Sequence, residues 1–416
     1  MPLNLRLVQE LGKKLSDTRR SILSYPPYTP QLPSSLFHGD TISGILHQRD
    51  ILLSYPYESM RPFLQFIKEA ASDPSVLSIK IAIYRLNSKA TLVNYLCTAA
   101  ENGKDVTVLI ELRARFDEQN NIDWSERLEE AGCTVIYGFP DYKVHAKICS
   151  ITKNDHGTVR YLTQIGTGNY NEKTATMYTD LSLLTADPAI GKDANEFFKN
   201  MMIGNLNGTY KHLLVAPTGL KPALLSLMDQ EIAKGEHGRI LLKLNSLTDL
   251  DIMEKLREAS KAHVQVTMIV RSICCLLPGV PGETENLHIR SIVGRFLEHS
   301  RIYCFGFGSE EKLFIASADF MTRNTQRRVE IACPIYDADV RNKIHHILDL
   351  CLQDNLRARQ LQPNGSYAPI DRHNLPSLDC QQQLMDEALT NSSRTVHKNT
   401  FIQKLKTMIR RKRKTS

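Results

Sequence analysis

The sequence has no apolar run of the roughly 18 residues that a membrane-spanning helix needs. Its first six residues lack the charged stretch and apolar core of a secretory signal. The nine cysteines are an odd number, form no CxxC pair and belong to no His/Cys cluster with zinc-ligand spacing. These absences argue against a membrane span, a disulfide framework and a zinc site, and they predict a cytoplasmic protein.

Positive charge is concentrated at the C-terminal end. The formal net charge is +7, yet no acidic residue follows Glu387, whereas nine lysines and arginines do. The rest of the chain is nearly neutral, which is unlike a nucleic-acid-binding protein, and we expect no nucleic-acid partner. Residues 395–416 are expected to be a disordered basic tail, with peripheral contact to an acidic membrane as the alternative.

The chain contains two copies of one unit. One apolar strand pattern ends in Arg85-Leu-Asn-Ser, and another ends in Lys243-Leu-Asn-Ser. A helix pattern and a second strand pattern, at 105–111 and 265–271, follow each of them. The helix patterns place on one face Leu92, Val93, Leu96 and Ala99 in the first copy, and Ile252, Met253, Leu256 and Ala259 in the second. This alternation predicts an α/β fold of two units, each a mixed β-sheet flanked by helices.

Turn-forming residues mark the boundary between the copies near 205–220. They are Gly204, Asn205, Asn207, Gly208, Pro217 and Gly219. Residues 1–30 are too short for a domain and lead into a proline-rich stretch, so we expect a remnant of an upstream domain there. The predicted organisation continues with a first domain at 31–210, a second at 211–394, and the basic tail.

Each copy carries a histidine among cationic residues. His145 lies in Lys143-Val-His-Ala-Lys147, and His299 precedes Arg301 at the corresponding place of the second copy. In an extended strand over 143–148, alternate side chains share a face, so His145 is expected beside both lysines. Nearby positive charge lowers the pKa of a histidine and keeps the imidazole neutral and nucleophilic. The cations can then bind the oxygens of a transferred phosphoryl group.

Polar loops follow both histidines. In Gly166-Thr-Gly-Asn169 the glycines let backbone N–H groups approach an anion, and Thr167 and Asn169 add side-chain donors. Asn324 follows the second histidine at nearly the distance at which Asn169 follows the first. Asp180 and Asp319 are the carboxylates best placed to orient a histidine through its second ring nitrogen. A lone strand histidine is usually structural, but the duplication favours a phosphate-handling site shared by the two copies.

Several longer motifs make the sequence similar to one known family. They include Tyr55-Pro-Tyr57, Ile83-Tyr-Arg85, Glu111-Leu-Arg-Ala-Arg-Phe-Asp117, Gly166-Thr-Gly-Asn-Tyr-Asn-Glu-Lys173, Tyr178-Thr-Asp-Leu-Ser-Leu-Leu-Thr185, Ile273-Cys-Cys275 and Ser291-Ile-Val-Gly-Arg-Phe-Leu-Glu-His-Ser-Arg-Ile-Tyr303. On these motifs and the His145 segment, the chain resembles the bacterial histidine-phosphorylating polyphosphate kinases from about Ile51 to Asp354.

The resemblance implies two tandem phospholipase D-like domains and an activity. Such enzymes reversibly transfer the γ-phosphate of ATP to polyphosphate, with magnesium. His145 matches the phosphorylated histidine and His299 the second essential histidine, which contacts nucleotide phosphates. Tyr178 and Arg271 match nucleotide-contacting positions. The remaining candidates for nucleotide or phosphate binding are Lys147, Thr167, Asn169, Arg301 and Asn324.

Arg85 and Arg115 match positions that the family assigns to its magnesium site. A guanidinium is always charged and cannot be an ordinary metal ligand. We therefore expect both arginines to hold phosphate oxygens that themselves bind Mg²⁺.

Two alternatives to an active kinase stay open. The resemblance implies upstream helical and head domains that supply an adenine contact and much of a homo-oligomer interface, so the chain can be a non-catalytic polyphosphate-binding fragment. A phospholipase D-like phosphodiesterase is less favoured, because its signature asks for a lysine two residues after each histidine and the second copy has Arg301.

Overall fold

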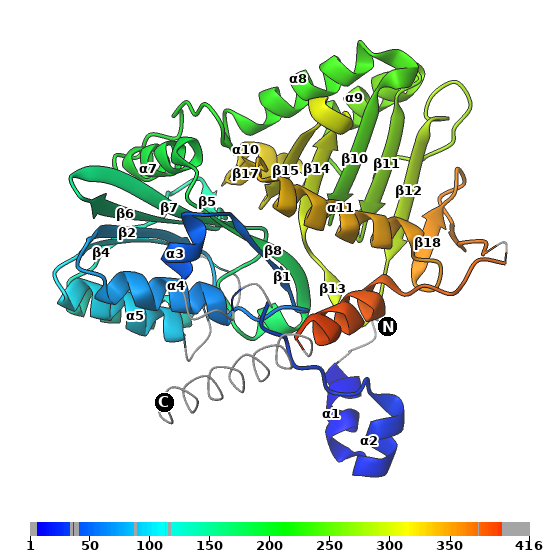
Figure 1. Cartoon of the computed structure of the whole chain (residues 1–416). Coiled ribbons are helices and arrows are strands. Elements are labelled where there is room, and N and C mark those ends of the chain that lie inside the picture. The colour runs from blue at the N-terminus through cyan, green and yellow to red at the C-terminus, as the bar shows by residue number, and fades with distance from the viewer. Residues whose placement is uncertain are drawn as a thin grey trace, which may run out of the picture.

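Two mixed β-sheets flanked by helices form the body of the protein, as the sequence predicts (Figure 1). The computed structural model describes residues 6–33, 36, 41–86, 90–112, 114, 118–372 and 374–392. The expected tail at 395–416 and Arg115 lie outside the described residues.

The first sheet has the strand order β1-β8-β7-β6-β2-β3-β4. β2, β3 and β4 run parallel to one another, and every other pair of neighbouring strands in this order is antiparallel. Its strands are β1 (Ile51–Tyr55), β2 (Val76–Ile83), β3 (Asp105–Ile110), β4 (Thr134–Tyr137), β6 (Ile148–Asp155), β7 (Thr158–Gly166) and β8 (Tyr178–Thr185).

The second sheet has the order β19-β18-β12-β11-β10-β14-β15-β17-β9. β10, β11 and β12 are its parallel strands, which repeats the arrangement of β2, β3 and β4. Its strands are β9 (Leu214–Val215), β10 (Arg239–Leu244), β11 (Gln265–Val270), β12 (Leu287–Ile292), β14 (Arg301–Phe305), β15 (Lys312–Ala316), β17 (Ile331–Pro334), β18 (Ala358–Leu361) and β19 (Tyr367–Pro369).

Helices cover the outer faces of both sheets and fill the space between them. α4 (Arg61–Ser72) and α5 (Thr91–Glu101) share a core with the first sheet, and α8 (Leu220–Ile232) and α9 (Leu250–Lys261) share one with the second. A third core joins both sheets with α7 (Pro188–Met202) and α11 (Ala338–Gln353). The eight apolar positions predicted to face the core on α5 and α9 are all buried. Each large apolar side chain among them stabilises the fold by roughly 1.5–3 kcal/mol.

The strand register corrects one detail of the expected duplication. Ile81 pairs with the residue four positions after His145, and Leu242 pairs with the residue four positions after His299. Arg85 therefore corresponds to Ser246, and the resemblance between Arg85-Leu-Asn-Ser and Lys243-Leu-Asn-Ser is out of register by three residues. Lys243 lies buried within β10, whereas Arg85 follows the end of β2.

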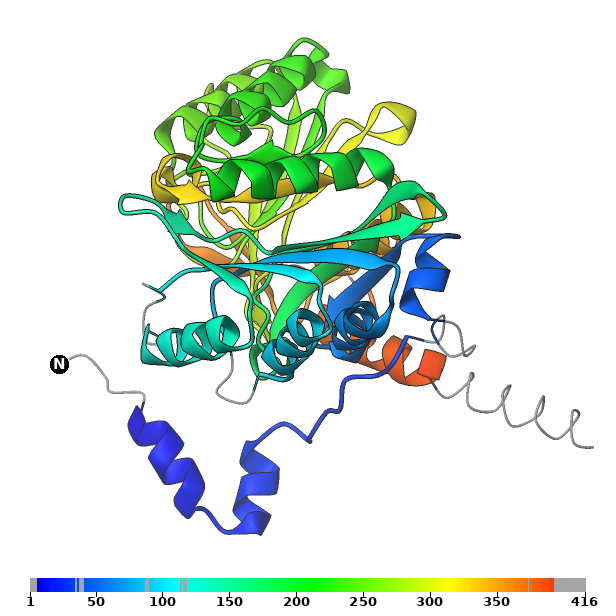
Figure 2. The ribbon, with the colours of Figure 1, turned by 90° about the vertical axis from the view of Figure 1, so that its left-hand side faces the viewer.

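The N-terminal helices lie apart from both sheets. α1 (Arg6–Lys14) and α2 (Asp17–Leu23) project from the body in Figure 2. The segment that follows them is held by Arg295, whose guanidinium lies 5.3 Å from the ring centroid of Tyr25 and 5.9 Å from that of Tyr28. Within the described part of the chain, no helix has the length and apolar character needed to cross a bilayer.

Asp50 provides a test of the contact between the two halves. Its backbone N–H donates to Asp337 Oδ2 of the second half at 3.4 Å. Burial raises the pKa of the Asp50 carboxyl to about 6, and the carboxylates of Asp337 and Asp187 add to the rise. Because the folded pKa exceeds the unfolded value of 3.8, folding is favoured when Asp50 is protonated, and this contribution is lost as pH rises through about 6.

We therefore expect Asp50→Asn to stabilise the protein above pH 6, by about 1–2 kcal/mol once solvent screening of this partly exposed group is allowed for. Urea unfolding at pH 7.5 and pH 5 measures the effect, and the gain should be smaller at pH 5. Asp105→Asn, at an exposed position, removes the same charge and should give little change. A gain that does not depend on pH would contradict the assignment.

Candidate active site

Each candidate histidine lies at a break between two strands. β5 (Lys143–Val144) and β6 flank His145, whereas β13 (Leu297–Glu298) and β14 flank His299. The expected continuous strand over 143–148 is therefore wrong. The short strand before each histidine pairs with the other half, β5 with β16 (Arg328–Val329) and β13 with β8, before the chain enters its own sheet.

The two halves exchange the carboxylates that orient the histidines. His145 Nδ1 lies 3.0 Å from Oε2 of Glu330, which belongs to the second half. His299 Nδ1 lies 2.8 Å from Oδ2 of Asp180, which belongs to the first half. Each carboxylate comes directly after the two residues that pair across the halves, which are Tyr178 and Thr179 for Asp180, and Arg328 and Val329 for Glu330. The reciprocal pairs form because the two short strands cross.

Neutral side chains complete the hydrogen bonding of both carboxylates. Thr167 Oγ1 donates to Asp180 at 2.6 Å, and Ser317 Oγ donates to Glu330. Asn324, on α10 (Thr322–Gln326), donates to Glu330 Oε1 at 2.7 Å. Glu330 is fully buried. The carboxylates are thereby fixed, and a fixed carboxylate keeps its histidine in the tautomer with a proton on Nδ1.

A buried lysine and a buried arginine lie beside the rings, and burial lowers the pKa of the Lys147 ammonium well below its usual value. Lys147 Nζ donates to the backbone oxygen of His145. Arg301 Nη1 lies 3.4 Å from His299 Nε2 and donates to Thr167 O at 3.1 Å, while Nη2 donates to Asp319 Oδ2 at 3.0 Å. An arginine N–H pointing at Nε2 requires a lone pair there, which agrees with a proton on Nδ1 of His299.

Burial is the main reason why both imidazoles are neutral. It lowers the pKa of His145 well below the usual value, and the charges of Lys147, Arg328 and Arg301 lower it further. Burial also lowers the pKa of His299, although Asp180 opposes this. The pKa of His145 is lowered, as expected, but burial lowers it more than the neighbouring cations do. The charges of Lys147 and Arg301 lower the pKa of both histidines, so the two rings share one cationic environment.

Aromatic rings border both histidines. Tyr84 packs edge-on against His145 at 4.7 Å between centroids, and Tyr178 lies 5.3 Å from His299. The guanidinium of Arg85 and the ammonium of Lys147 each lie 5.4 Å from the Tyr84 ring centroid. The structure thus brings Arg85 and Tyr178 to the site.

Arg271 also reaches the site. Its Nε donates to Asn245 Oδ1 at 2.9 Å, and Asn245 Nδ2 donates to the backbone oxygen of His299 at 3.2 Å. Burial lowers the pKa of Arg271, and the charge of Arg301 lowers it further. Of the residues predicted from the sequence, only Arg115 is not placed.

The structure decides which acidic residue orients which histidine. Asp180 orients a histidine as expected, but that histidine is His299 of the other half. Asp319 was expected to orient a histidine and instead binds Arg301. Glu330 was missed. The signal that was missed is a repeated spacing. Thr167 precedes Asp180 by 13 residues, and Ser317 precedes Glu330 by 13 residues.

Equivalent hydrogen bonds also correct the pairing of the asparagines. Thr167 N–H donates to Leu181 O and Ser317 N–H donates to Ile331 O, both at 2.9 Å. Two residues further on, Asn169 therefore corresponds to Asp319, and Asn324 has no counterpart at that position. Asn169 Oδ1 is buried without a hydrogen-bond partner, as is Asn324 Oδ1. The side chains of Thr167 and Asn324 already donate hydrogen bonds to Asp180 and Glu330. Of these three residues, Asn169 is therefore the best candidate for direct contact with a bound phosphate.

Gly168 makes room for the Asp180 carboxylate. A Cβ at residue 168 would lie 2.1 Å from Asp180 Oδ2, which is closer than two non-bonded atoms can approach. The sequence suggested that this glycine lets the backbone approach an anion, whereas in the structure it admits the acid that orients His299.

We expect Gly168→Ala to displace Asp180 and to lower any activity that depends on His299 by about 10²-fold, because a misplacement of 1 Å can cost that much. Gly12→Ala, on α1, where the glycine has open space around it and no positive φ, is the control for the loss of a glycine. Activity and thermal unfolding of both variants measure the effect. Full activity of Gly168→Ala would show that the carboxylate can move without consequence.

The described residues do not provide a protein-built metal site. Nowhere among them do three His, Cys, Asp or Glu side chains lie together as a metal would require. The carboxylates of the site are already paired with histidine or arginine. Any metal would need oxygen ligands from a bound anion.

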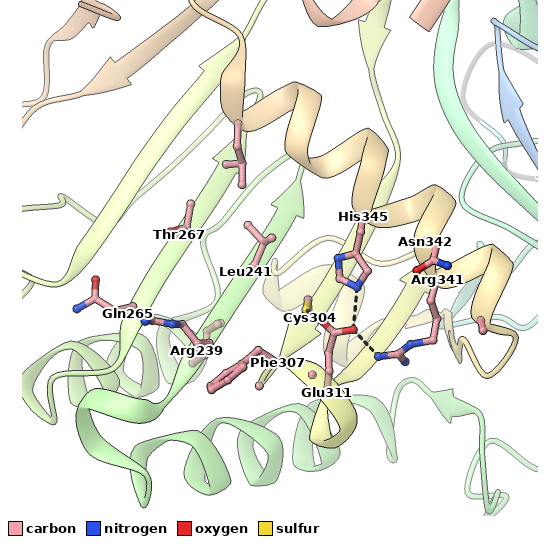
Figure 3. Close-up of a pocket in the computed structure, with 15 residues that line it drawn as sticks. Arg239, Leu241, Gln265, Thr267, Cys304, Phe307, Glu311, Arg341, Asn342 and His345 are labelled. Atoms are coloured by element: carbon pink, nitrogen blue, oxygen red, sulfur yellow. Dashed lines mark hydrogen bonds and ion pairs between the residues drawn. The ribbon is translucent and has the colours of Figure 1, made fainter. Parts of the chain in front are cut away.

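A large cavity lies elsewhere, on the second sheet. It has a volume of about 720 Å³ and is lined by β10, β11 and α11 residues (Figure 3). Glu311 accepts a hydrogen bond from Arg341 and lies 2.9 Å from His345 Nε2 there. None of the site residues above lines this cavity.

The chain is similar to known proteins of one family. A family model described as polyphosphate kinase C-terminal domain 1 matches residues 41–206, and one described as polyphosphate kinase C-terminal domain 2 matches residues 213–381. A polyphosphate kinase of Staphylococcus haemolyticus is 43% identical over 391 residues, which cover 93% of this chain and 54% of the relative. The chain spans about half the length of the curated relatives it matches.

Solved structures agree. A crystal structure of polyphosphate kinase from Porphyromonas gingivalis superposes with a TM-score of 0.83 at 32% identity, covering 91% of this chain and 59% of that one. A phosphatidylserine synthase from Haemophilus influenzae superposes with a TM-score of 0.51 at 10% identity, covering 86% and 98% respectively, and shares the fold alone. These matches confirm the expected α/β fold of two tandem units, each a mixed β-sheet flanked by helices.

Proposed function

The chain belongs to the polyphosphate kinase family, and from this premise we propose that it is an ATP-polyphosphate phosphotransferase. It moves the γ-phosphoryl group of ATP reversibly to the end of polyphosphate through a phosphohistidine on His145. The observation that supports this most is the exchanged carboxylate pair, which leaves Nε2 of a neutral His145 with a free lone pair among cations.

The proposed reaction has two transfers. Nε2 of His145 attacks the γ-phosphorus, the Nε2–P bond forms, and ADP leaves with the electrons of the broken P–O bond. Phosphorylation makes the ring cationic, and the carboxylate of Glu330 stabilises that charge through Nδ1–H. A terminal oxygen of polyphosphate then attacks the same phosphorus, and Nε2 leaves with its electron pair. The same contacts serve both directions.

His299 and its neighbours are proposed to bind the phosphates on the other side of the transferred group. In the unliganded chain its ring is neutral, because burial lowers its pKa. Phosphate charge nearby favours the protonated ring, so His299 can give a proton to a departing oxygen and take it back. Tyr178 and Arg271 are proposed to contact the nucleotide. Lys147, Thr167, Asn169, Arg301 and Asn324 complete the proposed phosphate site, directly or by holding the carboxylates.

Magnesium is proposed to enter with the nucleotide. The donor set of the described residues does not fit a protein-held Mg²⁺, since the nearby acids are committed to histidines and arginines. Arg85 and Arg115, which match positions that the family assigns to its magnesium site, are proposed to hold phosphate oxygens that ligate the ion.

The limits 31–210 and 211–394 are proposed as the two catalytic domains, with 1–30 as a remnant of an upstream domain. A homo-oligomer and contact of the tail with a membrane surface are proposals of the same kind, as is the cytoplasmic location.

Incubation with Mg²⁺ and ATP labelled at the γ-phosphate tests the function. We expect acid-labile, base-stable label on the protein, which unlabelled polyphosphate then removes into longer chains. Binding of polyphosphate with no label on the protein would establish a binding fragment instead.

A further inference from the structure

The residues on both sides of His299 converge on one buried ammonium group. Lys243 Nζ lies 2.7 Å from Glu298 Oε2 and donates to Ser300 Oγ at 2.8 Å. The side chains of Lys243 and Glu298 are 2% and 5% exposed. The main chain on either side of His299 is therefore tied to a single point within the second sheet.

A hydroxyl group from the first half joins the same network. Thr179 Oγ1 accepts the backbone N–H of His299 at 3.1 Å and donates to Glu298 Oε2 at 3.0 Å. Thr179 is the neighbour of Asp180, which orients the His299 ring. One two-residue segment thus holds both the main chain and the ring of His299.

The C-terminal helix, residues 380–392, supplies a third contact. Gln381 Nε2 donates to Glu298 Oε1 at 2.6 Å and to Phe296 O at 3.0 Å. Its Oε1 accepts the Phe296 N–H at 2.8 Å. Gln381 is buried, and it satisfies the second oxygen of the Glu298 carboxylate.

The first half shows that the fold does not need these polar groups. By the strand register, the positions of Lys243, Glu298, Ser300 and Thr179 correspond to Ala82, Val144, Ala146 and Val329 around His145. All four of those residues are apolar and fully buried. Because a buried ion pair is often no more stabilising than apolar residues of similar volume, stability alone does not account for the polar set.

We propose that Thr179, Lys243, Glu298 and Gln381 form a clamp that positions His299, and only His299, against Asp180 during phosphoryl transfer. This inference rests on the proposed function. It assigns the two histidines different supports. The side chains that bind the main chain at His145 belong to the first half: Glu111 accepts the Val144 N–H at 2.8 Å, and Lys147 donates to His145 O. The His299 clamp instead spans the first half, the second half and the C-terminal helix.

Thr179→Val and Thr179→Ser form the matched pair that tests the clamp. The valine variant copies the counterpart Val329 and removes both hydroxyl hydrogen bonds, whereas serine retains them. We expect Thr179→Val to lower kcat by about 10–100-fold with KM for ATP changed by less than about 3-fold, and Thr179→Ser to stay near wild type. Gln381→Ala should show a smaller loss of kcat, with Gln382→Ala, at an exposed position of the same helix, as its control.

A second readout does not depend on catalysis. In the wild-type chain, the Nδ1–H of His299 that is bonded to Asp180 should give a downfield proton resonance, identified by its absence in His299→Gln. Thr179→Val should shift or broaden this signal and leave that of His145 unchanged. Wild-type kcat and an unchanged signal in Thr179→Val would overturn the clamp. Failure of the wild-type chain to accept label from ATP would overturn the proposed function, while the resonance still tests the clamp.

Discussion

Replacing His145 by alanine is expected to abolish labelling of the protein from γ-labelled ATP and to reduce polyphosphate synthesis by more than about 10³-fold. No other described side chain combines a free imidazole nitrogen with burial beside Lys147 and with a fixed acid at Nδ1. The loss of the nucleophile removes the covalent intermediate altogether. Label on the denatured protein and product chain length are the measurements.

Two controls make this result specific. His237→Ala changes a histidine whose side chain is 82% exposed, and it should label as the wild type does. Circular dichroism of His145→Ala should show that the fold is retained, while its unfolding temperature should fall, because the buried Glu330 carboxylate loses its histidine partner. Acid-labile label at the wild-type level on His145→Ala would place the phosphate on another residue.

Replacing Glu330 by glutamine is expected to slow phosphorylation of His145 by up to about 10⁴-fold, the loss that follows when the acid of a Ser-His-Asp triad is made neutral. The amide can donate to Nδ1 and so favour the tautomer with hydrogen on Nε2, which removes the attacking lone pair. It also removes the negative charge that stabilises the cationic phosphohistidine. Single-turnover labelling with saturating ATP measures this step.

Glu311→Gln is the matched control for Glu330→Gln. Glu311 is likewise a buried acid of the second half that pairs with a histidine, His345, but it lies in the cavity on the second sheet. Its replacement should leave the labelling rate within about 2-fold of wild type, as expected for a change outside the site. Equal rates for Glu330→Gln and the wild type would show that the acid from the second half has no part in the chemistry.

The exchanged acids also explain why the two halves need each other. Each half contains a histidine but lacks the carboxylate that orients it, since Asp180 serves His299 and Glu330 serves His145. Asp180→Asn should therefore impair the function of His299 and not that of His145, although Asp180 lies in the chain segment that follows His145. The predicted losses in these variants follow spatial partners rather than sequence neighbours.

Local patterns in the sequence were enough to determine the α/β class, the duplication, the buried faces of α5 and α9, and the two histidines with their cations. These features depend on periodicity and on residues a few positions apart, where the geometry of a strand or helix fixes which side chains share a face. The resemblance to the family rested on motifs of the same local kind.

Only the tertiary structure decided which acid reaches which histidine, that Arg85 does not correspond to Lys243, and that the Lys243, Glu298 and Gln381 network holds His299 and has no counterpart among the described residues at His145. Glu330 reaches His145 across 185 residues of chain, and Asp180 reaches His299 across 119. Such contacts arise from the crossing of β5 and β13 into the opposite half, and no local preference of the chain encodes that crossing. Side chains far apart in sequence become partners because burial of both sheets against a common core brings the strand ends together.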